Sequence, residues 1–302
     1  MKILVIGDCL IDHYIYAKTT RQSPEDKTIP VYDIEKEEYK VGGALNTALN
    51  LKSLSNSSIV SFSGIISTYA TGIFLNNNIL LDNCYYVVDK GKDNKLSTTD
   101  VLLKTRLIDI ETNKQFVRID NRKKYSDELI NRYYQLFKRI NINEYDGIVI
   151  SDYDKGIIYS SIVDNLFDYN GMVFVDTKKK DLSIWSNIEN CIIKINEKEY
   201  LEIEKDTDKS IKNLIITLGC NGAKLIEYGK TKFELSVDNK IKNPDPIGAG
   251  DTFLSGFVSY FLKTNDFMES IRFANLCASK SVQMPGTSVV SYDEILGMWS
   301  GK

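Results

Sequence analysis

The stretch NPDPIGAGDTFLSGF, residues 243–257, places three small residues and a carboxylate directly before an apolar run. From Ala249 onward, apolar residues recur at spacings of three and four, which predicts a helix that begins here. Gly248, Ala249 and Gly250 would leave backbone N–H groups unobstructed at its N-terminus. Because those donors lack intrahelical partners and the helix dipole is positive there, an oxyanion or a phosphoryl group would fit.

Asp251 falls in the first turn of this predicted helix. A carboxylate in that place could take a proton from a hydroxyl group that attacks a bound phosphoryl group. The alternative is structural, because acidic residues are frequent in first turns, where they complement the helix dipole. The motif alone leaves both interpretations open.

The composition is that of an ordinary globular protein. The 302 residues are 43% hydrophobic, and the net charge of −3 gives no reason to expect nucleic acid or an anionic membrane surface as a partner. The apolar run before Gly7 is too short for a signal peptide or a membrane span, so we expect a cytoplasmic protein. The five cysteines lack any C-x-x-C pair, and we expect them to be reduced core thiols.

Short runs rich in Val and Ile alternate with longer amphipathic segments. The predicted strands cover residues 3–7, 58–64, 145–151, 171–176, 190–196 and 214–219, and the predicted helices cover residues 43–54, 127–140, 160–169 and 197–204. This β-α-β alternation predicts an α/β protein with a doubly wound, mostly parallel sheet flanked by helices. Ligands in such folds bind at the strand ends.

Residues 13–43 and 96–124 do not follow the β-α-β alternation. They show the alternating polar and apolar residues of strands, with turn residues between them. We expect them to form a small antiparallel β lid, at about 13–40 and 96–122, on a single domain of residues 1–302. Such a lid commonly covers a ligand. Its exposed edge or face also invites association, so we expect a homodimer in which two lids pair.

A second glycine motif, VGGALNTALNL at residues 41–51, opens another predicted helix. Gly42 and Gly43 would form the turn, and Asn46 would lie about one turn into the helix. Because Gly-Gly turns are common, this segment is also explained as a tight strand-to-helix turn with Asn46 capping or facing solvent.

Two further strand ends carry polar or small residues. INEKEY, residues 195–200, sets Asn196 and Glu199 three residues apart, which suits Mg²⁺ held directly or through water but is equally typical of a capping box. The glycines of ITLGCNGAKL, residues 216–225, would let a nucleotide approach the backbone, although a β-turn explains them as well.

Other charged residues have plainer interpretations. His13, the only histidine, lacks metal-site spacing and is interpreted as structural. Lys178–Lys180 would form a solvated basic surface at a strand end, with contact to a substrate phosphate as the alternative. No G-x-x-x-x-G-K-[ST] motif occurs, which excludes a Walker-type phosphate-binding loop. The segment GDCLID after the first strand lacks the G-x-G-x-x-G motif, which argues against a dinucleotide-binding enzyme.

Taken together, these motifs resemble the ribokinase/PfkB carbohydrate kinases. DPIGAGDTFLSGF is similar to their C-terminal signature, VGGALNTALNL to their N-terminal glycine motif, and INEKE to their N-x-x-E element. The order and spacing of the three motifs cover nearly the whole chain. The resemblance implies a ribokinase-like fold and an ATP-dependent kinase.

Within that family, the chain resembles the heptose-7-phosphate kinases that make ADP-heptose precursors for bacterial surface polysaccharide (lipopolysaccharide or capsule). The shared elements contribute Asp12, Arg21, Ser23, Pro24, Glu25, Ser151, Asp152, Tyr153, Lys155 and Gly156. The chain departs from them at Thr177, where those kinases usually have Pro, and at Pro246, a position more often Thr. A nucleotidyltransferase domain, often fused to such kinases, is not found in this sequence, and we expect a separate protein to perform the next step.

The resemblance implies roles at the matching positions. Asp251 would be the base, and Gly248, Ala249 and Gly250 would form the anion hole for the γ-phosphoryl group. Arg118 and Lys155 would bind the substrate's phosphate or nucleotide phosphates, with a solvated surface as the alternative. Sugar hydroxyls would be held by Asp12, Gly42, Gly43 and Asn46.

The resemblance also implies cofactor sites. Asn196 and Glu199 would manage Mg²⁺, in part through water. A K⁺ ion, used by many relatives, would lie near Asp245, Ile247 and Gly286. The ATP pocket would be lined by Asn196, Thr217, Gly219, Gly222, Gly248, Gly250 and Asn275.

Two other functions stay open at this point. The chain could be a kinase of the same family for another sugar, sugar phosphate or nucleoside. It could also be a non-catalytic sugar-binding protein on the same fold, although Asp251, the intact G-A-G sequence and the N-x-x-E element argue against that.

Overall fold

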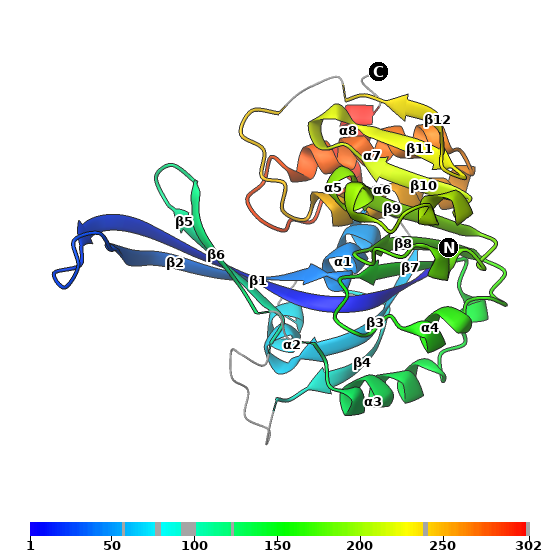
Figure 1. Cartoon of the computed structure of the whole chain (residues 1–302), viewed down its shortest axis with the longest axis horizontal. Helices are drawn as coiled ribbons and strands as arrows, with labels where there is room; N and C mark the ends of the chain where they lie inside the picture. The colour runs from blue at the N-terminus through cyan, green and yellow to red at the C-terminus, as the bar shows by residue number, and fades with distance from the viewer. Residues whose placement is uncertain (56–57, 76–79, 92–100, 122–123, 238–240, 300–302) are drawn as a thin grey trace.

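The computed structural model describes residues 1–55, 58–75, 80–91, 101–121, 124–237 and 241–299. Its main feature is one sheet with the strand order β12-β11-β10-β9-β8-β7-β1-β3-β4 (Figure 1). From β9 through β4 neighbouring strands run parallel, and β10 also runs parallel to β9, whereas β11 and β12 add an antiparallel edge. The bounds are β1 Lys2–Gln22, β3 Ile59–Ser67, β4 Asn83–Asp89, β7 Gly147–Asp152, β8 Met172–Thr177, β9 Cys191–Asn196, β10 Asn213–Thr217, β11 Ala223–Glu227 and β12 Lys230–Leu235.

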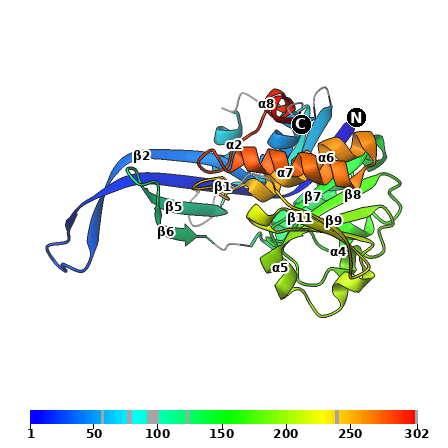
Figure 2. The same cartoon turned by 90° about the horizontal axis from the view of Figure 1, so that it is seen from above.

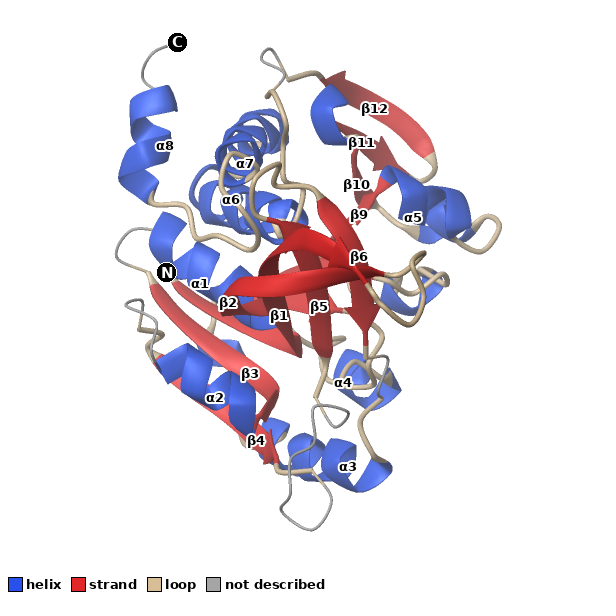
Figure 3. Cartoon of the chain, turned by 90° about the vertical axis from the view of Figure 1, so that its left-hand side faces the viewer, coloured by secondary structure: helices blue, strands red, loops and turns tan. Residues whose placement is uncertain are grey.

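Helices cover both faces of the sheet because its strands are apolar on both sides. Along β1, Leu4 and Ile6 pack into one core cluster and Ile3 and Val5 into the other. Figure 3 shows α1, α6 and α7 on one side of the sheet and α3, α4 and α5 on the other. The helices are α1 Ala44–Leu54, α2 Thr68–Leu75, α3 Asp127–Phe137, α4 Ser160–Asp164, α5 Glu197–Glu202, α6 Ala249–Thr264, α7 Phe267–Ser281 and α8 Tyr292–Trp299.

The lid is built from the second half of β1 together with β2 Pro30–Gly43, β5 Leu103–Asp109 and β6 Gln115–Asp120. β2 pairs antiparallel with β1, β5 pairs parallel with β1, and β6 pairs antiparallel with β5. Figures 1 and 2 show these strands projecting from the body of the protein. The lid is therefore confirmed, although its sheet is mixed rather than antiparallel, because β5 pairs parallel with β1. Of its predicted second segment, residues 96–100 and 122 lie outside the described residues.

One strand serves both the sheet and the lid, which the sequence pattern did not predict. We expected a strand over residues 3–7 followed by a separate insertion, but β1 runs without a break from Lys2 to Gln22. The continuity has a physical reason: no proline or turn-forming cluster interrupts the alternation after Gly7. The base of the lid is thus continuous with a strand of the main sheet that lies between β7 and β3.

The other predicted strands and helices are found close to their predicted bounds, although α4 ends at Asp164 rather than at residue 169. The thiol prediction needs a correction. Cys9, Cys191 and Cys277 are buried, but Cys84 is only partly buried and Cys220 is exposed, because it lies in the loop that follows β10. In the described part of the chain, no helix combines the length and the apolar character that crossing a membrane requires.

Candidate active site

The glycine turn before α6 leaves backbone donors open at the N-terminus of the helix. Gly248 is the N-cap and has φ 76°, a left-handed conformation that favours glycine. No acceptor in the described residues takes the amide hydrogens of Gly250 and Asp251, as expected for the first turn of a helix. The amide of Ala249, in contrast, already donates to the carbonyl oxygen of Pro246 at 3.2 Å. Of the three predicted anion-hole residues, Ala249 therefore has its donor engaged.

Asp251 points into the site, between two donors. Its side chain is only 3% exposed. Asn46 Nδ2 donates to Asp251 Oδ2 at 2.8 Å, and the Tyr153 hydroxyl donates to Asp251 Oδ1 at 2.9 Å. Burial raises the pKa of Asp251, and the hydrogen bond from Asn46 opposes that shift. A residue that only complemented the helix dipole would not need two side-chain donors.

The glycine motif at the start of α1 brings Asn46 to this place. Gly43 has φ 63°, and a Cβ there would collide with the backbone oxygen of Asp8, so the turn requires glycine. A Cβ at Gly42 would collide with the carboxylate of Asp12. The pair of glycines thus lets the chain pass close to Asp12 while α1 presents Asn46 to Asp251.

A cavity of about 260 Å³ lies between the lid and the N-terminus of α6. The predicted residues Asp12, Gly43, Arg118, Gly248 and Asp251 line it, whereas Gly42, Asn46 and Lys155 do not. The remaining lining residues are Leu10, Lys104, Arg106, Tyr153, Pro246, Ile247 and Thr287. Lys155 instead donates its backbone N–H to Asp8 Oδ2 at 3.1 Å.

Three cations of the lid face this cavity, and two of them were missed in the sequence. Arg106 lies directly across the β5–β6 ladder from Arg118, and Lys104 lies two residues before Arg106 on the same face of β5. The alternation of Lys104 and Arg106 in a predicted strand was the signal that could have identified them. Their convergence with Arg118 depends on the pairing of β5 with β6.

The two arginines have carboxylate partners, whereas the lysine has none among the described residues. Arg106 Nη1 binds Asp12 Oδ1 at 2.6 Å, and Arg118 makes two hydrogen bonds to Asp120, each of 2.6 Å. The ammonium of Lys104 lies 4.8 Å from the centre of the Tyr153 ring. Burial lowers the pKa of Lys104, a shift that an anionic ligand would reverse.

A second cavity, of about 190 Å³, lies on the other side of the glycine turn. Its lining includes the four residues that were predicted to bind the nucleotide and nothing else, Thr217, Gly219, Gly222 and Asn275. Apolar residues such as Phe253, Ala278 and Val282 complete it. Ala249 and Gly250 face this cavity, Gly248 and Asp251 face the first one, and Pro246 lines both. The two cavities therefore meet at the helix N-terminus that could bind a transferred phosphoryl group.

Asn196 and Glu199 form the capping box that the sequence offered as the alternative to a magnesium site. Asn196 Oδ1 accepts from the Glu199 amide and Glu199 Oε2 accepts from the Asn196 amide, both at 2.9 Å. Glu199 Oε1 also binds Lys178. No group of three or more His, Cys, Asp or Glu suited to a metal occurs among the described residues. The side-chain oxygen atoms of Asn196 and Glu199 are of the kind that Mg²⁺ prefers. Two residues alone would hold the ion only through water, with phosphate oxygens as its other ligands.

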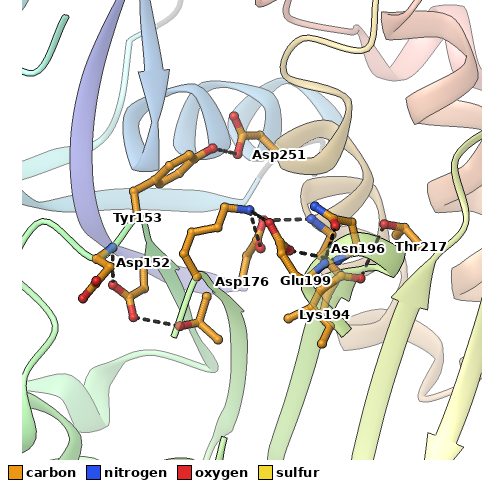
Figure 4. Close-up of polar contacts among 12 residues, drawn as sticks. Asp152, Tyr153, Asp176, Lys194, Asn196, Glu199, Thr217 and Asp251 are labelled. Carbon is orange, nitrogen blue, oxygen red and sulfur yellow. Dashed lines mark hydrogen bonds and ion pairs between the residues drawn. The ribbon is translucent and has the colours of Figure 1, made fainter. Parts of the chain in front are cut away.

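Figure 4 shows these residues beside a buried ion pair that the sequence did not indicate. Lys194 Nζ binds Asp176 Oδ2 at 2.8 Å, and a Cβ added to Gly250 would lie 2.8 Å from that ammonium. Gly250 therefore allows a buried cation to lie directly against the glycine turn.

The three residues predicted for a monovalent cation lie together. Asp245 Oδ1 accepts from the Ile247 amide at 3.1 Å, and Asp245 Oδ2 accepts from the Gly286 amide at 2.7 Å. This carboxylate holds the loop before the glycine turn against the loop before Thr287.

A family model described as pfkB family carbohydrate kinase matches residues 165–294. Over 97% of its length, the chain is 30% identical to the bifunctional protein HldE of a Nitratiruptor species and 29% identical to that of a Helicobacter pylori strain. It spans 64% and 66% of these two relatives, just under two thirds of their length.

Solved structures share the fold. Ribokinase from Thermotoga maritima superposes with a TM-score of 0.70 and 17% identity over 99% of both chains. Phosphofructokinase-2 from Escherichia coli, solved in complex with potassium, has a TM-score of 0.73 and 15% identity over 100% of this chain and 98% of that one. These similarities establish the ribokinase-like fold.

The lidded sheet is that of the ribokinase-like fold, and two cavities meet at the N-terminus of α6. In sequence, the chain is similar to the pfkB carbohydrate kinases over residues 165–294 and to the HldE relatives over 97% of its length. Kinases of this family use ATP and Mg²⁺.

Proposed function

We propose that this kinase transfers the γ-phosphoryl group of ATP to a hydroxyl of a sugar phosphate, and that the sugar is heptose 7-phosphate, which becomes heptose 1,7-bisphosphate. The observation that carries the proposal is the set of three lid cations across the cavity from Asp251. Arg106 and Arg118 are paired with Asp12 and Asp120, whereas Lys104 has no carboxylate within ion-pair distance among the described residues. A phosphate on the substrate would supply that partner.

The proposed reaction follows from the placement of the groups. The sugar lies in the lid cavity with its reacting hydroxyl at Asp251, which accepts the proton. The amides of Gly248, Gly250 and Asp251 stabilise the charge on the transferred group. Asp12 and Gly43 line the sugar side, and Asn46 orients the base.

We propose that ATP occupies the cavity lined by Thr217, Gly219, Gly222 and Asn275. Mg²⁺ on its phosphates would be held through water by Asn196 and Glu199, and would neutralise negative charge when bound. The segment around Asp245, Ile247 and Gly286 is proposed to bind K⁺, the ion with which phosphofructokinase-2 from Escherichia coli was solved in complex.

Turnover of a panel of sugars tests the proposal, with release of ADP as the readout. We expect kcat/KM for sugar phosphates to exceed that for the matched unphosphorylated sugars by about 100-fold, with heptose 7-phosphate as the best substrate. Lys104→Met should reduce kcat/KM for the phosphorylated sugar by about 10-fold or more, because charge-assisted hydrogen bonds contribute roughly 1.5–3 kcal/mol.

Lys18→Met is the matched control, since Lys18 lies on the same lid but pairs with Glu111 away from the cavity. It should leave the sugar preference unchanged. Turnover of ribose or fructose 6-phosphate with none of heptose 7-phosphate would replace the heptose assignment with another sugar of the same family. Binding of a sugar without any ADP release would support the non-catalytic alternative.

We also propose that two lids pair in a homodimer. Arg118 and Asp120 are ion-paired on one face of β6, so Val117 and Ile119 lie on the other face, where both are exposed. Sedimentation should show a dimer for the wild type and a monomer for Ile119→Glu. Leu201→Glu is the control, because Leu201 is an exposed apolar residue of α5 that lies outside the lid. A monomeric wild type at working concentration would contradict the proposal.

The pathway around the kinase remains part of the proposal. The HldE relatives are named bifunctional, and we propose that a nucleotidyltransferase, expected to be a separate protein, acts after this kinase. Because the reaction consumes ATP, we place it in the cytoplasm.

A further inference from the structure

Tyr153 is the residue of the lid cavity whose hydroxyl touches the proposed base. It follows β7, and its hydroxyl reaches Asp251 (Figure 4), which also accepts a hydrogen bond from Asn46 of α1. The two donors bind different oxygens of the carboxylate, at 2.9 and 2.8 Å. A carboxylate held at both oxygens has a fixed plane, and each oxygen keeps a lone pair for a further donor.

The backbone of Tyr153 is held by a fully buried carboxylate. Asp8 Oδ2 accepts from the Tyr153 amide at 2.8 Å and from the Lys155 amide at 3.1 Å. Asp8 is 0% exposed and lies on β1, the strand that continues into the lid. The loop that carries Tyr153 is thus hydrogen-bonded to β1, which lies next to β7 in the sheet.

The ring of Tyr153 is held by two cations from different elements. The ammonium groups of Lys104 and Lys178 lie 4.8 and 5.5 Å from its centre. Burial, followed by the charge of Asp251, raises the pKa of Tyr153 well above its ordinary value. Tyr153 therefore stays protonated, and toward an ionised Asp251 its hydroxyl acts as a donor.

We infer that Tyr153 is a positioning residue for phosphoryl transfer, which fixes the carboxylate of Asp251 toward the incoming hydroxyl and stabilises its ionised form. The inference rests on the proposed function, since it takes Asp251 as the base. In the step itself the sugar hydroxyl gives its proton to Asp251 as its oxygen bonds to the γ-phosphorus and ADP leaves, while Tyr153 keeps its own proton.

Several charged groups face Asp251, and all of them are unchanged when only the hydroxyl is removed. Lys104 from β5, Lys178 after β8 and Lys194 from β9 favour the ionised carboxylate, whereas Asp176 from β8 disfavours it. Asp12 lines the same cavity. Burial and the charge of Asp152 raise the pKa of Asp8 to about 7, and Asp8 accepts from the backbone amide of Tyr153 rather than from its hydroxyl.

Tyr153→Phe isolates the hydroxyl, because the ring and its contacts with both lysines remain. We expect kcat at pH 7 to fall about 10-fold or more, with KM for ATP unchanged. The loss of a donor should raise the pKa of Asp251, so the acidic limb of the kcat/KM profile should move to higher pH by about one unit and part of the rate should return at high pH. A profile that superimposes on that of the wild type, or a change in KM alone, would overturn the inference.

Tyr133→Phe is the matched control. Tyr133 is a buried tyrosine of α3 whose hydroxyl bonds to Ser63 Oγ at 3.0 Å, within the core and outside the lid cavity. It should lose stability without any shift of the pH profile. The thermal midpoint and ADP affinity of Tyr153→Phe should stay near those of the wild type, which shows that the variant is folded.

Asp251→Asn separates this inference from the function on which it rests. If that variant is inactive and Tyr153→Phe keeps the wild-type profile, the role of Tyr153 is wrong and the kinase mechanism stands. If Asp251→Asn keeps full activity, the proposed base is wrong. A changed pH profile in Tyr153→Phe would then have to come from a titrating group other than Asp251.

Discussion

Asp251→Asn is expected to lower kcat by about 1,000-fold while the protein still folds and binds nucleotide. Proton transfer by a positioned side chain contributes roughly 100- to 10,000-fold to a rate, and Asn cannot accept the proton. In loose phosphoryl transfer the proton leaves late, so the position of this carboxylate matters more than its basicity. The two hydrogen bonds from Asn46 and Tyr153 supply that position.

The measurement is steady-state turnover of the best sugar from the panel, together with calorimetric binding of ADP. ADP affinity should be unchanged, because the nucleotide cavity is lined by Ala249 and Gly250 but not by Asp251. Asn at position 251 removes a buried charge whose pKa is raised by burial. The variant should therefore be at least as stable as the wild type near neutral pH.

Asp266→Asn is the control for the structural interpretation of Asp251. Asp266 is the N-cap of α7 and accepts from the Glu269 amide at 3.0 Å, so it too is a carboxylate at a helix N-terminus. Its replacement removes the same charge and keeps a good cap. Activity should be unaffected there, and equal activities for the two variants would mean that Asp251 only complements its helix.

The sequence identified those parts of the site that are local in the chain. The glycine turn at Gly248, the first-turn carboxylate of Asp251 and the turn at Gly43 follow from conformations that only a few residues accept. The same local patterns cannot distinguish function from structure. Asn196 and Glu199 form the capping box that competed with the magnesium interpretation, and both descriptions use the same atoms.

What the sequence did not reveal depends on pairing between distant segments. Arg106 meets Asp12 only because β5 joins β1, and it meets Arg118 only because β6 joins β5. Tyr153 was part of a recognised segment, but its contact with Asp251 spans 98 positions of the chain. No periodicity within either segment indicates that contact.

Arg106→Met is the second variant for which we expect a large effect, because it leaves the buried carboxylate of Asp12 without its partner. The side chains of Arg106 and Asp12 are 6% and 5% exposed, and their ion pair is 2.6 Å long. Removal of one partner from a buried pair typically costs 3–5 kcal/mol, so we expect the free energy of unfolding to fall by about 3 kcal/mol. Sugar affinity should fall as well, since both residues line the cavity.

The double variant Asp12→Asn/Arg106→Met tests whether the unpaired charge causes the loss of stability. Chemical denaturation of the wild type, the two single variants and the double variant gives the four free energies of unfolding. The double variant should recover most of the lost stability, because no unpaired charge remains, but it should not recover turnover. Arg118→Met is the control on the neighbouring strand. Its pair with Asp120 is 45% and 28% exposed, so its loss should cost less than about 1 kcal/mol. Equal losses for Arg106→Met and Arg118→Met would contradict a buried, sugar-facing ion pair and would place both arginines in solvent.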